Sequence, residues 1–353
     1  MPTRSVMTSS WFRRLGTKGS GFRYVDAHGD AIRDRRTLDR LDALRVPPAW
    51  RNVHLAPSPR SAIQAWGFDA RERKQYRYND RAVERRELRK YYRVRQLAKD
   101  LPRIRRAMHV DARTSSRAKT LDADTVAATV LRLISETFCR VGGERYAREN
   151  GTFGITTLRK SHVELCDGTA CFDYRGKGSI WQRQVVTDPD LVKLVARQLR
   201  TPGKKLFRYR RNGGWHAITA RDVNGYLHDR LGSYSAKDFR TWGGTLRAAT
   251  VLAELGPAKS ATEAKRNVAL AMRLVSTELG NTPTICRKSY VHPIVIARYL
   301  DEGETITLPK ARRNATNRGQ AHSPEERALI VFLDRHFPER RSRSRRDHRR
   351  GVA

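Results

Sequence analysis

Residues typical of helix caps recur through the second half of the chain, and this pattern constrains the fold more than any other feature. Four segments with helical apolar spacing begin at Ser, Thr or Asp, and the last three end at glycine: 188–200, 219–232, 235–256 and 260–280. A fifth, 323–337, begins with a Ser323/Glu326 capping box and has Pro324 at its first helical position. Residues 122–142 predict an earlier buried helix. We therefore expect a mainly helical region.

Two stretches depart from this helical pattern. Residues 154–186 alternate polar and apolar side chains around an Asp167-Gly168 turn and a Gly176-Lys177-Gly178 turn. This predicts a three-stranded meander with Lys177 on a hairpin tip. The first ninety or so residues consist of short candidate strands separated by turn residues and prolines, which predicts a small β-rich domain.

The expected fold is α+β. We predict a β-rich amino-terminal domain at 1–96 and a linker at 97–104, where Pro102 interrupts the sequence. A larger, mainly α domain with the three-stranded meander follows at 105–337. Residues 338–353 complete the chain as a basic disordered tail, because 340–350 hold seven arginines, one aspartate and no apolar residue.

The charge of the chain predicts its partner. Its 353 residues contain 72 Lys+Arg against 36 Asp+Glu, a formal charge of +36. A field of this strength favours a polyanion, first of all nucleic acid. A membrane surface is the rival, but the chain has no run of eighteen apolar residues and no apolar leader after its first fourteen. We expect a cytoplasmic, nucleoid-associated protein with no membrane partner.

Residues 71–106 are the most basic stretch that also contains aromatic residues. They hold fifteen Lys/Arg against five Asp/Glu, a difference of ten, with four tyrosines interleaved. This composition suits phosphate contacts combined with base stacking, although a solvated helix face is the simpler alternative. The candidate DNA contacts at its start are Arg73, Lys74, Gln75, Tyr76 and Tyr78.

No cofactor is predicted. The four cysteines form no Cys-x-x-Cys pair and are too few for a disulfide framework, so we expect reduced thiols. The ten histidines lack zinc-binding spacing, and no Gly-x-x-x-x-Gly-Lys-Ser/Thr loop is present to hold nucleotide phosphates. Asp122-x-Asp124 resembles a magnesium-binding pair, but it precedes an apolar helix and is better interpreted as a helix cap.

Tyr290, in the stretch RKSYVHP, is the candidate nucleophile. A tyrosine can attack a phosphodiester, but its ordinary pKa near 10 leaves about one phenolate in a thousand at neutral pH. It therefore needs fixed cations for the developing charge and an acid for the leaving oxygen. The sequence offers Arg140, Lys177, Lys237, Arg240 and Asn281. Each is weak alone, since lone cations are usually surface charges.

In combination, the order of these residues resembles the active site of the type IB DNA topoisomerases. Arg140 is followed by Lys177 on a hairpin, a Lys237-x-x-Arg240 pair, Asn281 and Tyr290, as in the compact bacterial and poxvirus-like branch. Residues 45–80 are similar to the amino-terminal DNA-clamping domain of that branch. The resemblance covers about residues 20 to 335, and it implies the catalytic fold shared with tyrosine recombinases.

The resemblance implies a role for each residue. Tyr290 is expected to be the nucleophile, and Arg140 and Arg240 to clamp the scissile phosphate. Asn281 stands where relatives have histidine or asparagine, and since an amide cannot exchange protons it is expected only to donate a hydrogen bond. Lys177 is expected to be the general acid and Lys237 an accessory phosphate contact. The protein is expected to close as a monomer around duplex DNA and to need neither ATP nor metal.

Three alternatives stay open at this point. A tyrosine site-specific recombinase shares the chemistry, but it typically has His-x-x-Arg where this chain has Lys237-x-x-Arg240. A non-enzymatic nucleoid or RNA-binding protein is the second alternative, because the positive charge of the chain alone would be sufficient for it. A metal-dependent topoisomerase is the weakest, because it rests on Asp122-x-Asp124 alone.

Overall fold

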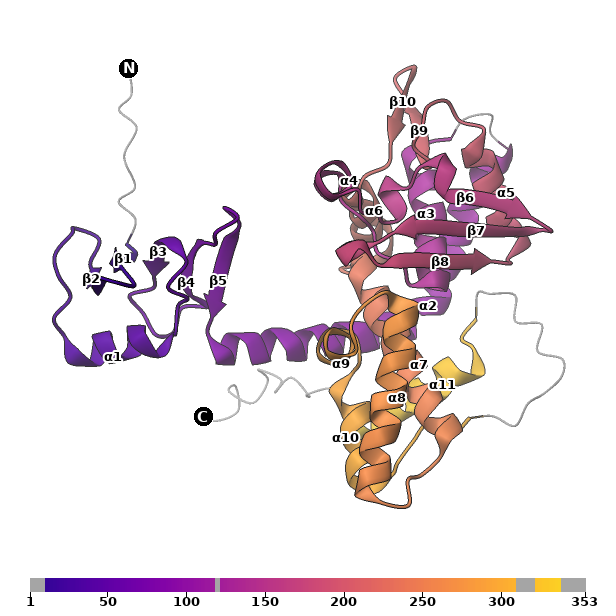
Figure 1. Ribbon diagram of the computed structural model, residues 1–353. Coiled ribbons are helices and arrows are strands. Elements are labelled where there is room, and N and C mark those ends of the chain that lie inside the picture. Colours follow the sequence, from indigo (N-terminus) through magenta and orange to yellow (C-terminus); the bar gives the residue numbers. More distant parts are fainter. Residues whose placement is uncertain (1–9, 118–120, 309–320, 338–353) are drawn as a thin grey trace, which may run out of the picture. The chain divides into compact units, whose positions relative to one another are not determined.

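The structure is a computed structural model that describes residues 10–117, 121–308 and 321–337 (Figure 1). The chain divides into two compact units, one ending at Lys90 and the other beginning at Tyr91. The basic tail expected at 338–353 lies outside the described residues.

The first unit is a five-stranded antiparallel sheet with one helix against it. The sheet order is β2-β1-β3-β4-β5, and α1 lies against it (Figure 1). Leu41 of α1 packs with Val53, Leu55 and Ala65 of the sheet. The expected β-rich amino-terminal region is thereby confirmed. The elements are β1 (Phe12–Thr17), β2 (Gly21–Val25), α1 (Arg35–Ala43), β3 (Arg51–Leu55), β4 (Ile63–Phe68) and β5 (Lys74–Tyr78).

A single long helix, α2 (Asp80–Arg117), runs through the segment expected to be a linker. Pro102 lies inside it, but Leu97, Leu101, Ile104 and Met108 recur at helical spacing and are all fully buried. An interior proline costs about 3 kcal/mol. Burial of each large apolar side chain contributes about 1.5–3 kcal/mol, so the buried stripe outweighs the proline. The structure therefore places residues 97–104 in a helix.

The expected three-stranded meander is present. It consists of β6 (Val163–Cys166), β7 (Thr169–Arg175) and β8 (Trp181–Val186), paired antiparallel in that order. Asp167 and Gly168 make the first turn with positive φ, and Lys177 lies on the second, between β7 and β8. The inward face of β7 buries Ala170, Phe172 and Tyr174 against α3 and α5.

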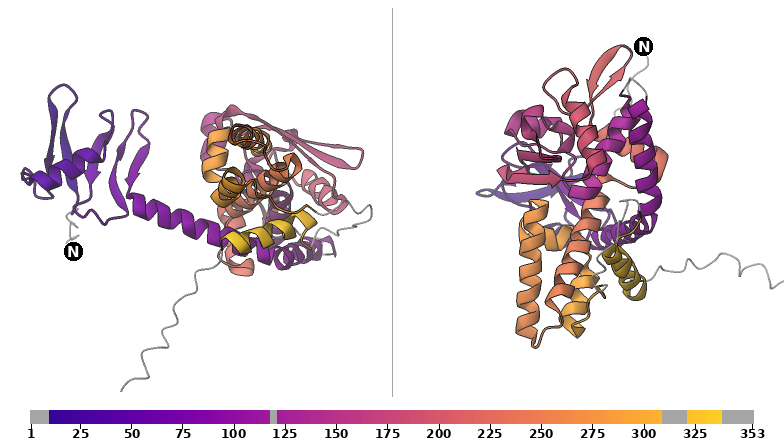
Figure 2. Two further views of the ribbon diagram at one scale, coloured as in Figure 1. Left: turned by 90° about the horizontal axis from the view of Figure 1, so that it is seen from below. Right: turned by 90° about the vertical axis from the view of Figure 1, so that its right-hand side faces the viewer.

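The other elements of the second unit are mostly helices. Asp122 caps α3 by accepting a hydrogen bond from the Thr125 amide, as the cap interpretation predicted. The helices α7 and α8 lie side by side (Figure 1, Figure 2). The elements are α3 (Ala123–Thr137), α4 (Glu144–Asn150), α5 (Pro189–Leu199), β9 (Arg208–Arg211), β10 (Gly214–Ala217), α6 (Ala220–Tyr226), α7 (Ala236–Leu255), α8 (Ala261–Leu279), α9 (Pro283–Ser289), α10 (Pro293–Glu302) and α11 (Pro324–His336).

Two ion pairs with buried carboxylates fix the frame of this unit. The Arg93 guanidinium donates to both Asp238 carboxylate oxygens at 3.0 and 2.8 Å, which anchors the first turn of α7 on α2. Arg105 likewise donates to both oxygens of Glu326, each at 2.8 Å, and so fixes α11. Among the described helices, none has the length and apolar character needed to span a membrane.

Candidate active site

Four segments of the helical unit converge near Tyr290. The loop after α3 brings Arg140, because Phe138 adopts a left-handed conformation (φ 51°) that ends the helix. The helix α7 brings Arg240. Gly280, at φ 59°, ends α8 and places Asn281 just before Thr282, the N-cap of α9, whose C-cap is Tyr290. The structure thus brings together four residues, the first and last of which are 150 positions apart in the sequence.

The two arginines share a backbone acceptor. Nη1 of Arg140 lies 3.3 Å from the Leu279 carbonyl oxygen, and Nη2 of Arg240 donates to the same oxygen at 2.8 Å. Arg140 also donates to the Gly280 carbonyl at 3.0 Å, and Arg240 to that of Phe138. Among the described residues neither guanidinium is paired with a carboxylate. Two adjacent cations without a carboxylate form a site for an anion.

The orientation of Asn281 follows from its neighbour. Arg140 Nη2 donates to Asn281 Oδ1, and since arginine has no acceptor, the amide oxygen must face it. Asn281 Nδ2 is then left as a donor. This nitrogen is buried and has no hydrogen-bond partner among the described residues. The same holds for Nε of the almost fully buried Arg240. Buried donors of this kind normally have an acceptor, so both are suited to a bound anion.

The cations also act on Tyr290. Burial alone raises the pKa of this phenol, but the charges of Arg240, Arg140 and Lys237 and a hydrogen bond with Arg240 outweigh it, so the pKa lies below 10. The Arg240 guanidinium carbon is 5.1 Å from the centre of the Tyr290 ring. Burial and the adjacent Arg240 charge lower the pKa of Arg140. The arrangement favours the phenolate, the nucleophilic form.

The two lysines are placed differently. Lys237 is exposed on the first turn of α7, close enough for its charge to act on Tyr290. Lys177 is exposed on the tip between β7 and β8, where Gly176 precedes it and Gly178 follows with φ 74°. No contact between Lys177 and the four convergent residues is present in the described structure.

The backbone of Tyr290 is held by residues to which the sequence assigned no role in the site. One of them, Tyr91, is among the four tyrosines interleaved in residues 71–106, but it is buried rather than open to a base. Thr245 Oγ1 lies 3.3 Å from the Tyr290 carbonyl oxygen and accepts a hydrogen bond of 3.0 Å from the His292 amide. The Tyr91 hydroxyl donates to the Val291 carbonyl at 3.0 Å. The pair Gly243-Gly244 inside a predicted helix is the sequence feature that could have indicated this close packing around Tyr290.

Those two glycines make room for the site. A Cβ on Gly243 would lie 2.4 Å from the Phe138 ring, and one on Gly244 would lie 2.9 Å from the Tyr290 carbonyl oxygen. Paired glycines within a helical pattern indicate a close approach of another segment.

The expected DNA contacts of the amino-terminal unit lie on or beside the edge strand β5. Lys74 Nζ is 3.8 Å from the centre of the Trp66 ring, and Tyr76 and Tyr78 stack with ring centres 5.9 Å apart. Both tyrosines are about 40% exposed. Arg73 and Gln75 instead bind the carboxylate of Asp69, at 2.7 and 2.9 Å, and so stabilise the turn between β4 and β5. A DNA contact by these five residues stays a prediction.

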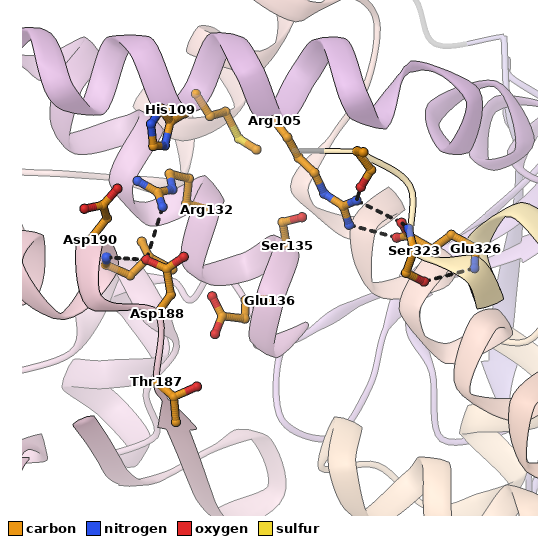
Figure 3. A pocket seen from close by; sticks show the side chains of 13 residues that line it. Arg105, His109, Arg132, Ser135, Glu136, Thr187, Asp188, Asp190, Ser323 and Glu326 are labelled. Atoms are coloured by element: carbon orange, nitrogen blue, oxygen red, sulfur yellow. Dashed lines mark hydrogen bonds and ion pairs between the residues drawn. The ribbon is translucent and has the colours of Figure 1, made fainter. Parts of the chain in front are cut away.

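A cavity of about 410 Å³ lies at a seam between α2, α3 and α11 (Figure 3). None of the expected site residues lines it. Arg105 is paired with Glu326, and Arg132 lies 3.4 Å from Asp188, so the charged groups around the cavity largely neutralise one another. Burial, reinforced by Asp188, raises the pKa of Glu136. Within the described residues, no group of three or more potential metal ligands is gathered there or elsewhere.

Comparisons with known proteins point to one family. The family described as the catalytic core of eukaryotic DNA topoisomerase I matches residues 74–315, and the amino-terminal domain of bacterial DNA topoisomerase IB matches 21–69. DNA topoisomerase 1B of Acanthamoeba polyphaga mimivirus is 30% identical over 76% of this chain and 82% of its own length. DNA topoisomerase 1B of Vaccinia virus (strain Copenhagen) is 24% identical over 67% of this chain and 72% of its own.

Among solved structures, XerH site-specific recombinase in a post-cleavage complex with palindromic difH substrate gives a TM-score of 0.33 at 16% identity, over 52% of this chain and 47% of that one. The family match spans well over half of the sequence and includes Arg140, Lys177, Arg240, Asn281 and Tyr290. The chain therefore belongs to the type IB DNA topoisomerases.

Proposed function

We propose that Tyr290 cleaves the DNA strand in the reaction by which this type IB topoisomerase relaxes supercoiled DNA. The Tyr290 oxygen attacks a backbone phosphorus, and the bond from phosphorus to the 5′ oxygen breaks. A 3′-phosphotyrosyl bond and a free 5′ hydroxyl result. The cut strand turns about the intact one, and the hydroxyl attacks the phosphotyrosine to reseal it. One phosphoester replaces another at each step, so torsional strain drives relaxation without ATP.

The observation that carries the proposal is the phenol of Tyr290 beside two guanidiniums that bind no carboxylate among the described residues. A phosphorane carries more negative charge on its non-bridging oxygens than the ground-state phosphodiester does. Fixed cations and donors therefore stabilise the transition state more than bound substrate. Arg140 and Arg240 supply the charge, and the free Nδ2 of Asn281 supplies a neutral donor.

Lys177 is the proposed general acid. A sugar alkoxide is a poor leaving group, and a positioned proton donor accelerates its departure by about 10² to 10⁴. Lys177 is an exposed cation on a hairpin tip in the same unit as Tyr290. It protonates the 5′ oxygen as the bond to phosphorus breaks, while Lys237 adds charge from the start of α7.

The proposed partner is duplex DNA, bound by a monomer that closes around it. A formal charge of +36 supplies the phosphate contacts. On β5, the exposed rings of Tyr76 and Tyr78 beside Lys74 offer stacking and charge in the amino-terminal unit.

The test is relaxation of supercoiled plasmid without ATP and with excess chelator. The parent and an exposed-tyrosine control, Tyr146→Phe, are expected to relax both positive and negative supercoils. Tyr290→Phe is expected to bind plasmid with nearly unchanged affinity, because phosphate contacts dominate binding, and to relax none of it. Relaxation by Tyr290→Phe, or loss of parent activity in chelator with recovery on adding magnesium, contradicts the proposal.

A further inference from the structure

Gln182 connects the Lys177 hairpin to the rest of the site. It is the second residue of β8, lies opposite Tyr174 on β7 and is only 8% exposed. Its Nε2 donates to the Trp181 carbonyl at 2.9 Å, which fixes the direction of the side chain. Its amide lies against one glycine and its Cγ methylene against another.

The first glycine is Gly280. A Cβ added there would lie 2.2 Å from both Nε2 and Oε1 of Gln182, so the amide rests directly on the Gly280 backbone. Gly280 belongs to the anion-binding part of the site. Its carbonyl accepts from Arg140 at 3.0 Å, and the next residue is Asn281.

The second glycine is Gly176, the residue before Lys177. A Cβ there would lie 2.8 Å from Gln182 Cγ. The Gly176 amide donates to the Ile180 carbonyl at 2.8 Å, which closes the tip that carries Lys177. One buried side chain therefore touches both the base of this tip and the turn that leads into Asn281.

We infer that Gln182 is a positioning residue that sets the place of Lys177 relative to the phosphate held by Arg140 and Asn281. The inference rests on the proposed function, in which Lys177 must reach the leaving oxygen of that phosphate. The glycines on both sides of Lys177 can each adopt many backbone conformations, so the tip needs an external contact to hold one. A misplacement of about 1 Å can cost about 10²-fold in rate.

The test compares two glutamines on the same strand. Gln182→Ala is expected to slow single-turnover cleavage about 10- to 100-fold at saturating DNA, with affinity and melting temperature close to the parent. Gln184→Ala is the matched control. Gln184 also faces inward from β8, opposite Phe172, but the atoms nearest to the two glycines belong to Gln182 and Ile180 and not to Gln184, so cleavage is expected to stay within about twofold.

A double variant separates positioning from a general loss of packing. If Gln182 acts through Lys177, adding Gln182→Ala to Lys177→Ala causes no further loss of cleavage rate, whereas independent effects multiply. A further loss, or a slow Gln182→Ala enzyme beside a fully active Lys177→Ala enzyme, overturns the inference. This comparison holds even if Lys177 is not the acid.

A substrate with sulfur in place of the bridging 5′ oxygen tests the acid role separately, because a thiolate needs no proton to leave. Gln182→Ala and Lys177→Ala are both expected to recover near-parent rates on it. Recovery of Lys177→Ala alone overturns the inference about Gln182 and leaves the proposed function standing. If neither variant recovers on this substrate, Lys177 is not the general acid.

Gln182→Met keeps the inference testable should the alanine variant fold poorly. Methionine has the length to fill the space between Gly176 and Gly280 but lacks the amide. Because contact with the two glycines is the proposed cause, this variant is expected to cleave within about threefold of the parent. A folded Gln182→Met enzyme as slow as the alanine variant contradicts it.

Discussion

At the scale of single residues, the site is an anion-binding cluster that acts on one phenol. Burial disfavours the charged form of Tyr290, and the neighbouring cations more than compensate. In the proposed reaction the same cations bind the non-bridging oxygens of the scissile phosphate. The pKa of the phenol therefore depends on the same groups that are proposed to hold the substrate.

The first prediction is that Tyr290 titrates below pH 10 in the DNA-free enzyme and that Lys237→Ala raises its pKa toward 10, because one of the lowering charges is lost. Phenolate absorbance recorded during a pH titration, with Tyr290→Phe as the reference to subtract, measures this. The cleavage rate of the parent is expected to rise with pH until the phenolate is formed. An unchanged titration in Lys237→Ala would show that Lys237 is electrostatically remote from Tyr290.

At the scale of elements, α7 is the platform of the site. Its first turn is anchored by the Arg93–Asp238 pair, which raises the pKa of Arg93, and it presents Lys237 and Arg240 one turn apart. Beyond Arg240 it carries Gly243 and Gly244, against which the Phe138 and Tyr290 segments pack.

The second prediction concerns this packing. Gly243→Ala places a methyl group 2.4 Å from the Phe138 ring, and overpacking of this kind costs about 1–3 kcal/mol of unfolding free energy. Cleavage is also expected to slow, because the Phe138 carbonyl accepts from Arg240. The control is Gly225→Ala in α6, where an added Cβ would meet no atom of another segment within 4 Å and alanine is expected to stabilise by about 0.5–1 kcal/mol. Equal unfolding midpoints in the two variants would contradict the packing at Gly243.

The third prediction concerns the attachment of α11. Burial raises the pKa of Glu326, but the hydrogen bonds and charge of Arg105 outweigh it, so the folded-state pKa is lowered. The pair therefore stabilises the fold above the ordinary glutamate pKa near 4.3, and this contribution is lost as the pH falls through the lower folded-state value.

Glu326→Gln is expected to lose about 3–5 kcal/mol at pH 7, because Arg105 is left charged and mostly buried. Its stability is also expected to fall less steeply than that of the parent below about pH 4. Denaturant unfolding at several pH values measures both effects. Glu149→Gln, which removes an exposed partner of Arg145, is the control and is expected to change stability by less than about 1 kcal/mol. Parallel pH profiles for the parent and Glu326→Gln would argue against a stabilising role for the pair.

At the scale of the whole molecule, local signals in the sequence predict the elements well. Capping residues such as Ser260, Ser323 and Asp122 mark helix starts because the cap hydrogen bond is made within a few residues. The meander follows from alternation and turn residues for the same reason.

Two features could not be predicted from the sequence because contacts between distant segments determine them. Helix α2 continues through Pro102 only because its apolar stripe is buried by other helices. The contact of Gln182 with Gly280 depends on where β8 lies relative to the end of α8, and nothing in a glutamine's chemistry marks it in advance. The four convergent residues were found through their order in the chain, whereas the threonine and tyrosine that hold the Tyr290 backbone carry no such signature.

The fourth prediction concerns the charge of the whole chain. Contacts with about eight phosphates give a slope of about −7 for log affinity against log salt concentration. Removing residues 338–353, with their seven arginines at 340–350, is expected to flatten this slope without abolishing single-turnover cleavage. Affinity measured over a series of salt concentrations decides it, and an identical slope in the shortened chain means that this segment makes no phosphate contact.

The central claim is that Tyr290 becomes bonded to the 3′ phosphate of the cut strand. Trapping the intermediate on a DNA whose downstream fragment dissociates, followed by proteolysis and mass spectrometry, identifies both the residue and the DNA end. We predict one modified peptide, with the nucleotide on Tyr290 through a 3′ phosphate and a free 5′ hydroxyl on the released fragment. Attachment to another residue, or a linkage to the 5′ phosphate, would contradict the account.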